Sequence, residues 1–206
     1  MSTEHTALNP RLPALLQQSA ALHRHLCPRQ VLGIRMGLLA GQQLDIDLPQ
    51  TTPKRLFVFM ETDGCAADGV AVATGCWVGH RTLRIVHYGK VAATFADRRT
   101  GRAFRIAPHP QARQAAVDSL PQAESRWQAM LEAYQWLPDT TLLQAVEVAL
   151  TDDLEHLISR PSARAICQRC GEEVFNELEV VVDGETLCRS CAGASYYHAL
   201  GETESG

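Results

Sequence analysis

Four cysteines near the C-terminus have the spacing of a metal site. Cys167 and Cys170 form one CxxC pair, and Cys188 and Cys191 form a second pair after 17 intervening residues. Each CxxC loop lets two thiolates reach one ion at about 2.3 Å, and two such loops complete a tetrahedral shell of four sulfurs. The spacing therefore predicts one structural zinc ion per chain. A closed shell of this kind leaves no coordination position for catalysis.

The residues around these cysteines predict a small treble-clef zinc finger. The segment "ELEVVVDGETL" between the pairs is typical of a β-hairpin, with Asp183-Gly184 as its turn. Gly171 follows the first pair, where a left-handed turn is often required. The segment "RSCAGASYYHAL" after the second pair can form a short helix. A module of this size has little core of its own, so the metal would supply much of its folding free energy.

The charge of the chain argues against nucleic acid and membrane surfaces as partners. Residues 161–206 contain three basic and eight acidic side chains, a net charge of −5, and the whole chain carries −4. Phosphate backbones and anionic lipids attract the opposite sign. The finger is therefore expected to contact protein or to cover a substrate.

Two histidines and a cysteine alternate before a proline in "HRHLCPRQV". Pro28 suits the first position of a helix, which would put Cys27 at the helix N-terminus. The helix dipole favours a thiolate there by about 0.3–1 kcal/mol. His23, His25 and Cys27 are thus candidates for a metal or catalytic site. The alternative is that the histidines cap carbonyl groups and the cysteine packs in the core.

A further thiol, Cys65, follows "TDG" and is also placed to begin a helix. His25, Cys27 and Cys65 would give a metal three ligands and one open position, with His23 as a fourth ligand or a supporting group. In the competing interpretation Cys27 or Cys65 is a nucleophile and a histidine, His25 among them, is its base. Both interpretations stay open at this point.

The elements that would position these side chains follow from hydrophobic periodicity. An α+β fold is expected, with a mixed helix and antiparallel-sheet core domain at 1–160 and the zinc finger at 161–206, divided near "SRPSARAI". "TLLQAVEVAL" fits a strand or a helix equally well. The expected helices are 12–26, 28–41, 66–76 and 111–137, the last interrupted near Pro121. The expected strands are 42–48, 54–61, 82–89, 90–97 and 101–108, the last three as a meander.

Seven cysteines without a secretory signal favour a reducing compartment, so the expected location is the cytoplasm. No apolar run reaches the length that a bilayer-spanning helix requires.

Three stretches in the same order resemble the FmdE family of formylmethanofuran dehydrogenase proteins. "LHRHLCPRQVLGIRMG" is similar to the family opening "FHGHxCPGxxxGxR", and "ETDGCAADGVAVATGCWVGHRTLRIVHYGKVAATF" is similar to its central stretch. "CQRCGEEV…DGETLCRSCAG" resembles its C-terminal zinc finger. The resemblance implies an α+β core followed by a treble clef, usually as a dimer, and a strand for "LLQAVEVAL".

The resemblance also assigns site residues. The positions that match the family motifs are His23, His25, Cys27, Glu61, Asp63, Cys65, Asp68, Gly75, Cys76, Gly89 and Lys90. Of these, Asp68 and Lys90 become candidates for binding a cofactor, with a helix cap and a surface lysine as the alternatives. Cys76 is expected to be a buried small residue. Arg24 and Arg29 replace family glycines, which could suit the site to an anion or simply face water.

The function that this resemblance implies is metal binding in one-carbon (formyl or formate) or molybdenum/tungsten enzyme metabolism. The expected partners are a second copy of the chain, a larger redox enzyme complex and an unidentified small molecule, with a second metal ion in the core site. The alternatives are a stand-alone Cys/His-dependent enzyme and a regulatory or metal-chaperone module. Only three cysteines lie outside the finger, too few for a four-thiolate iron–sulfur cluster, so the chain alone is not expected to oxidise formylmethanofuran or formate.

Overall fold

A five-stranded sheet organises the first part of the chain. Its order is β2-β1-β3-β4-β5, with β1 parallel to β2 and all other neighbours antiparallel. Gly101, with φ of 73°, lies in the tight β3–β4 connection, as the "DRRTG" segment predicts. The strands are β1 (Leu56–Met60), β2 (Leu83–Ile85), β3 (Ala93–Asp97), β4 (Ala103–Pro108) and β5 (Leu143–Val148).

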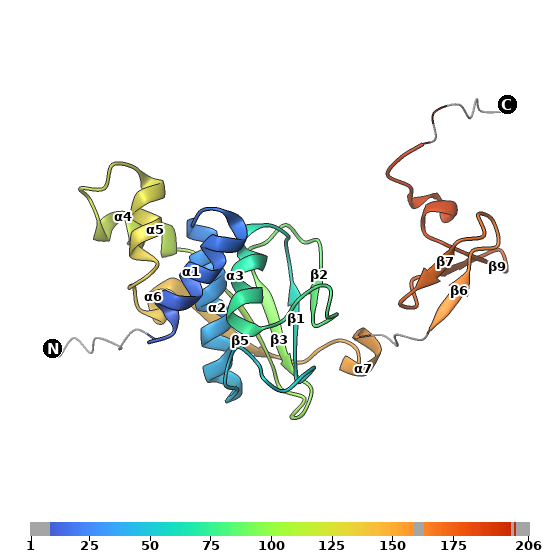
Figure 1. Ribbon diagram of the computed structural model, residues 1–206, viewed down its shortest axis with the longest axis horizontal. Helices are drawn as coiled ribbons and strands as arrows, with labels where there is room; N and C mark the ends of the chain where they lie inside the picture. Colours follow the sequence, from blue (N-terminus) through green and yellow to red (C-terminus); the bar gives the residue numbers. More distant parts are fainter. Residues whose placement is uncertain (1–8, 159–162, 199, 201–206) are drawn as a thin grey trace. The chain divides into compact units, whose positions relative to one another are not determined.

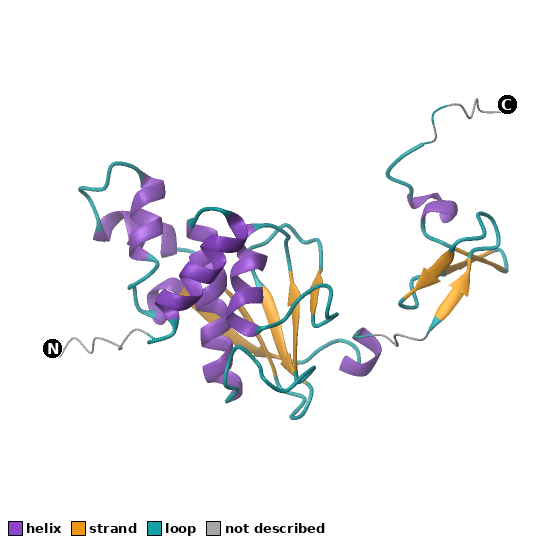
Figure 2. Cartoon of the chain, in the orientation of Figure 1, coloured by secondary structure: helices purple, strands orange, loops and turns teal. Residues whose placement is uncertain are grey.

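Helices cover one face of this sheet, and the computed structural model shows α1, α2 and α3 side by side in front of the strands (Figures 1 and 2). It describes residues 9–158, 163–198 and 200. The helices are α1 (Leu12–His23), α2 (Pro28–Leu44), α3 (Cys65–Thr74), α4 (Ala112–Ser119), α5 (Arg126–Ala133), α6 (Asp139–Leu142) and α7 (Leu154–Leu157). Among the described residues, no helix has the length and apolar character needed to cross a membrane.

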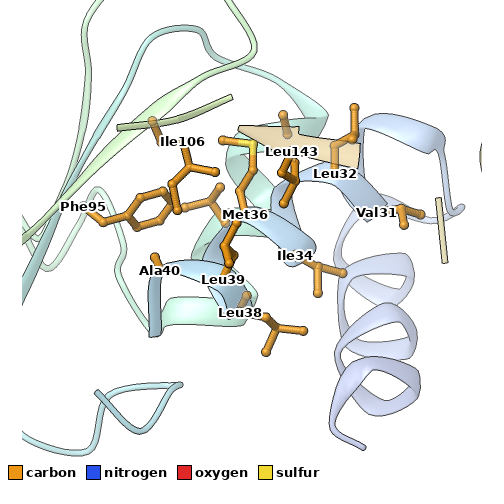
Figure 3. Close-up of a cluster of buried hydrophobic side chains, with 14 of the residues drawn as sticks. Val31, Leu32, Ile34, Met36, Leu38, Leu39, Ala40, Phe95, Ile106 and Leu143 are labelled. Atoms are coloured by element: carbon orange, nitrogen blue, oxygen red, sulfur yellow. The ribbon is translucent and has the colours of Figure 1, made fainter. Parts of the chain in front are cut away.

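The hydrophobic core lies between α2 and the sheet. Figure 3 shows Met36 and Leu39 of α2 projecting toward Phe95 of β3 and Ile106 of β4. Met36, Phe95 and Ile106 are fully buried. Each such side chain stabilises the fold by about 1.5–3 kcal/mol relative to an exposed position. The α+β prediction is thereby confirmed for this part of the chain.

Two glycines allow α2 and α3 to pack with their backbones in contact. A Cβ atom on Gly33 would lie 2.2 Å from the carbonyl oxygen of Ala66, and one on Gly69 would lie 2.3 Å from that of Gln30. Because the start of α2 faces the start of α3, the two helices run in the same direction. Their N-termini, at Cys27 and Cys65, therefore lie at the same end of the pair.

Two units divide the chain, Met1–Leu154 and Glu155–Gly206. The second contains β6 (Arg164–Ile166) paired with β7 (Glu173–Phe175), and β8 (Val180–Val182) paired with β9 (Glu185–Leu187). The β8–β9 turn places Asp183 at φ of 52° and Gly184 at φ of 86°, the left-handed pair that a two-residue hairpin favours. The predicted hairpin is confirmed.

Some sequence-based boundaries are wrong. The segment 42–48 is no strand, because α2 continues through Gly41 to Leu44 and Asp45 ends it in a left-handed conformation. β2 pairs with β1 and not with β3, so only β3 and β4 form the expected meander. The last cysteine lies in a single helical turn, Ser190–Ala194, and not in a terminal helix. The domain boundary predicted at 160/161 falls within 159–162, outside the described residues.

Candidate metal and ligand site

The four finger cysteines converge on one point. Ligand atoms of Cys167, Cys170, Cys188 and Cys191 all lie within 4.8 Å of one another. Within the described part of the chain, this is the only group of three or more His, Cys, Asp or Glu side chains with that property. Local backbone geometry produces it: Gly171 adopts φ of 76° and its N–H donates to the carbonyl oxygen of Cys167 (2.9 Å). The prediction of a four-cysteine cluster is confirmed.

The electrostatics of this cluster suit a cation. Hydrogen bonds from the backbone N–H groups of Cys170 and Cys188 lower the pKa of Cys167 to about 6. The neighbouring Cys188 thiol and burial raise the pKa of Cys191 to about 12, because the sulfurs compete for negative charge. A dication among them removes that competition, and four sulfur donors are the typical ligand set of structural zinc.

Cys27 lies at the N-terminus of α2, as predicted. Its backbone is extended, with φ of −132° and ψ of 160°, and Pro28 is the first helical residue. The Cys27 N–H donates to the side-chain oxygen of Gln30 (2.7 Å), while the Gln30 amide group donates to Ser19 Oγ (2.9 Å). These buried hydrogen bonds fix the cysteine between α1 and α2.

His23, at the end of α1, bridges two side chains of α3. Its Nε2 lies 3.2 Å from Cys65 Sγ, and its Nδ1 lies 2.9 Å from Asp68 Oδ2. Arg24 turns the chain sharply after α1 with φ of 65°, so α1 ends at His23 and not at Leu26 as expected. The histidine therefore reaches α3 across 42 residues of sequence.

The two core thiols contact each other. Burial raises the pKa of Cys65, and a hydrogen bond with Cys27 raises it further, whereas the positive charge of Arg29 lowers it by less. Arg29 thus acts electrostatically on this site, although its side chain is exposed. The structure brings His23, Cys27, Cys65 and Asp68 together.

His25 and Lys90 lie less centrally than the sequence interpretation put them. The His25 ring packs edge-on against the His23 ring at 4.9 Å and is exposed. Lys90 is exposed, and its backbone N–H donates to the carbonyl oxygen of Glu61 (3.3 Å). Cys76 is fully buried, as expected.

An ion pair that the sequence did not indicate supports the loop before Cys65. Arg105 of β4 donates from Nε and Nη2 to the two carboxylate oxygens of Glu61, at 2.6 and 2.8 Å. The backbone oxygen of Glu61 also accepts from the N–H of Tyr88 (3.0 Å). The only available signal was a charged residue within the apolar strand "AFRIAP".

A cleft of about 700 Å³ lies elsewhere in the first unit, along α1. Its walls include Leu16 and Leu26 together with Trp136, and none of the four clustered side chains lines it. It is therefore separate from the candidate site, although Leu26 adjoins Cys27.

Two family matches cover most of the chain. Residues 22–144 match the family described as "FmdE, Molybdenum formylmethanofuran dehydrogenase operon". Residues 161–197 match the prokaryotic dksA/traR C4-type zinc finger.

Two individual proteins are similar to this chain. A probable S-adenosyl-L-methionine-binding protein of Archaeoglobus fulgidus is 26% identical over 212 residues, covering 93% of this chain and 56% of that protein. The chain thus spans about half the length of that relative. A solved FmdE-like protein of tungsten formylmethanofuran dehydrogenase type, from Syntrophus aciditrophicus, has a TM-score of 0.60 at 24% identity, covering 91% of this chain and 95% of that chain. It shares the fold.

Proposed function

Because the chain belongs to the FmdE family, with more than half of its length matched, we propose that its core unit is a metal-binding unit of one-carbon or molybdenum/tungsten enzyme metabolism. In this proposal the finger holds a structural zinc ion. A second ion is held in the core by His23, Cys27 and Cys65, with His25 as a further ligand at the open side. The family description supplies the metabolic link.

The observation that carries the core site is the contact of Cys65 Sγ with His23 Nε2 at 3.2 Å, with the Cys27 thiol against Cys65. One imidazole and two thiols are donors that zinc-like ions prefer. Both cysteines begin helices, whose positive ends favour the thiolate forms that bind metal. When bound, the ion would supply Lewis-acid chemistry or a place to hold a ligand. The chain's own residues position and enclose it.

The direct test is metal content of the full chain after loading with zinc and removal of excess metal. We expect two ions per chain in the unsubstituted protein and one in the Cys65→Ser and His23→Ala variants. His87→Ala, at an exposed histidine, is the matched control and should retain both. One ion in the unsubstituted protein would contradict the core site.

A second candidate, a cysteine-dependent enzyme, is favoured by the chain of contacts from Asp68 through His23 to Cys65. This is the order orienting group, base and nucleophile. Alkylation separates the two candidates: a nucleophilic Cys65 reacts rapidly with iodoacetamide in metal-free protein and slows in His23→Ala. Reaction that is slow throughout, with two bound ions, favours the metal site. A chaperone or regulatory module would bind the core ion and release it to a chelator within minutes.

We expect the chain to act as a homodimer, with each finger reaching the core of the partner, and to associate with a larger redox enzyme. The finger exposes apolar side chains, among them Phe175, Val181 and Tyr196, that a protein contact would cover. Light scattering at micromolar concentration should return twice the chain mass of 22.6 kDa. A single chain mass would refute the dimer.

The small-molecule ligand is the remaining part of the proposal. The name of the Archaeoglobus relative makes S-adenosyl-L-methionine the first compound to test. Calorimetric titration of this chain, with and without the core ion, asks whether the matched half of that relative carries the binding site.

A further inference from the structure

Asp68 lies one helical turn after Cys65 on α3, so its carboxylate and the thiol face the same side of the helix. Both meet the His23 ring, at Nδ1 and Nε2 respectively. The two ring nitrogens point to different edges of the imidazole. The Asp68 oxygen and the Cys65 sulfur therefore lie at different edges of the same ring.

The direction of the hydrogen bonds follows from the donor inventory. A carboxylate can only accept, so His23 Nδ1 must donate to Asp68. In a neutral ring Nε2 then carries the lone pair, and this nitrogen faces Cys65. Without Asp68 either nitrogen could carry the proton, and half of the ring orientations would present the wrong atom.

We propose that Asp68 is a positioning residue that fixes the tautomer and rotation of His23 for a core ion, and is not itself a ligand. This inference rests on the proposed core site and assigns Asp68 a different role from direct cofactor binding. An oxygen that holds Nδ1 cannot reach an ion at Nε2 without giving up its hydrogen bond. The ion then sees nitrogen and sulfur donors only, which select Zn²⁺ or Co²⁺ over Mg²⁺ or Ca²⁺.

The experiment uses the full chain with zinc in the finger and Co²⁺ as the probe of the core. Competition with a chelator gives the Co²⁺ affinity, and visible absorption reports tetrahedral nitrogen–sulfur coordination. Asp68→Asn should weaken Co²⁺ binding by about 10–100-fold, the usual cost of losing the carboxylate behind a metal-bound histidine. Asp68→Glu keeps the charge and should recover part of the affinity.

Asp63→Asn is the matched control, because Asp63 precedes the same helix, is exposed, and carries the same charge. It should leave the affinity within about twofold, since one exposed charge acts weakly through water. In metal-free protein, the ¹⁵N shifts of the His23 ring should show a proton on Nδ1, and Asp68→Asn should change that pattern. A purely structural aspartate would not move the tautomer.

The outcomes are separable. Unchanged Co²⁺ affinity in Asp68→Asn overturns the role of Asp68 while the proposed function stands. An equal loss in Asp63→Asn also overturns it, because the effect would then be general charge. If the unsubstituted chain takes up no Co²⁺ beyond the finger, the proposed function fails and this role of Asp68 fails with it.

Discussion

The finger and the core site use similar donors but assemble them differently. In the finger, each pair of cysteines belongs to one short loop, and 17 residues separate the pairs. In the core, His23 meets side chains 42 and 45 residues away, because α2 and α3 pack in parallel. A site made by local loops depends on its metal, whereas a site made by helix packing depends on the hydrophobic core around it.

This difference has an energetic consequence. Few large side chains are buried in the described part of the finger unit, so metal and fold should form together there. The core unit buries residues of α2, α3 and the sheet in one cluster, and it should stand without any ion. The following changes test that contrast, from the largest expected effect to the smallest.

Cys167→Ser should abolish zinc binding by the finger and unfold it. Zinc contributes about 10 kcal/mol or more to small domains of this kind. Elemental analysis should show the loss, and limited proteolysis should cleave within 163–198 while the core survives. Cys76→Ser, at a cysteine outside the cluster, should retain the zinc. A protease-resistant finger in Cys167→Ser would show that the two regions do not differ in this way.

Arg105→Met should destabilise the core unit by about 3 kcal/mol, because it leaves the buried carboxylate of Glu61 without its charged partner. Urea unfolding measures the change. Arg102→Met removes the exposed pair with Glu147 and should cost less than about 1 kcal/mol. Equal effects of the two substitutions would argue that the Glu61 contact has no special weight. Zinc in the finger should be unaffected.

Gly33→Ala should cost about 2 kcal/mol, since the added methyl group forces α2 and α3 apart even after the gain in helix propensity. The separation should also weaken core-ion binding and leave finger zinc intact. Gly79→Ala places its methyl group in open space and should be neutral. A stable Gly33→Ala chain with an unchanged core site would mean that close helix contact does not build the site.

Asp97→Asn should have the smallest effect, and one that depends on pH. Burial raises the pKa of Asp97, but hydrogen bonds from Arg55, from the Arg99 N–H and from Thr100 outweigh it, so the pKa lies below its ordinary value. A lowered folded-state pKa contributes stability above the unfolded value of about 3.9, and this is lost as pH falls through the folded value. The unfolding free energies of the two proteins should therefore differ by about 1 kcal/mol at neutral pH and converge in acid. A constant difference would contradict this assignment.

Sequence patterns predicted the elements well where their signals are local. The two pairs of cysteines, the Asp183-Gly184 turn and the helix start at Pro28 all follow from a few adjacent residues. The failures concern competition between elements. The alternating "QQLDIDL" resembles a strand, yet α2 extends into it because its last turn buries Leu44 in the core.

The candidate core site was only partly predictable. The motifs named His23, Cys27, Cys65 and Asp68, but not which of them meet. Arg105 had no partner in any sequence pattern, since strand pairing alone brings β4 beside the loop of Glu61.

The sequence by itself determined the ligands of the finger, because two CxxC loops and a hairpin of fixed length leave the four sulfurs few other arrangements. It also determined that Cys27 begins a helix, because proline fixes the backbone at the next residue. The tertiary structure alone decided that His23 holds Asp68 on one side and Cys65 on the other. The reason is that Gly33 and Gly69 set how closely α2 and α3 approach, and only that distance carries the two helix starts to one histidine.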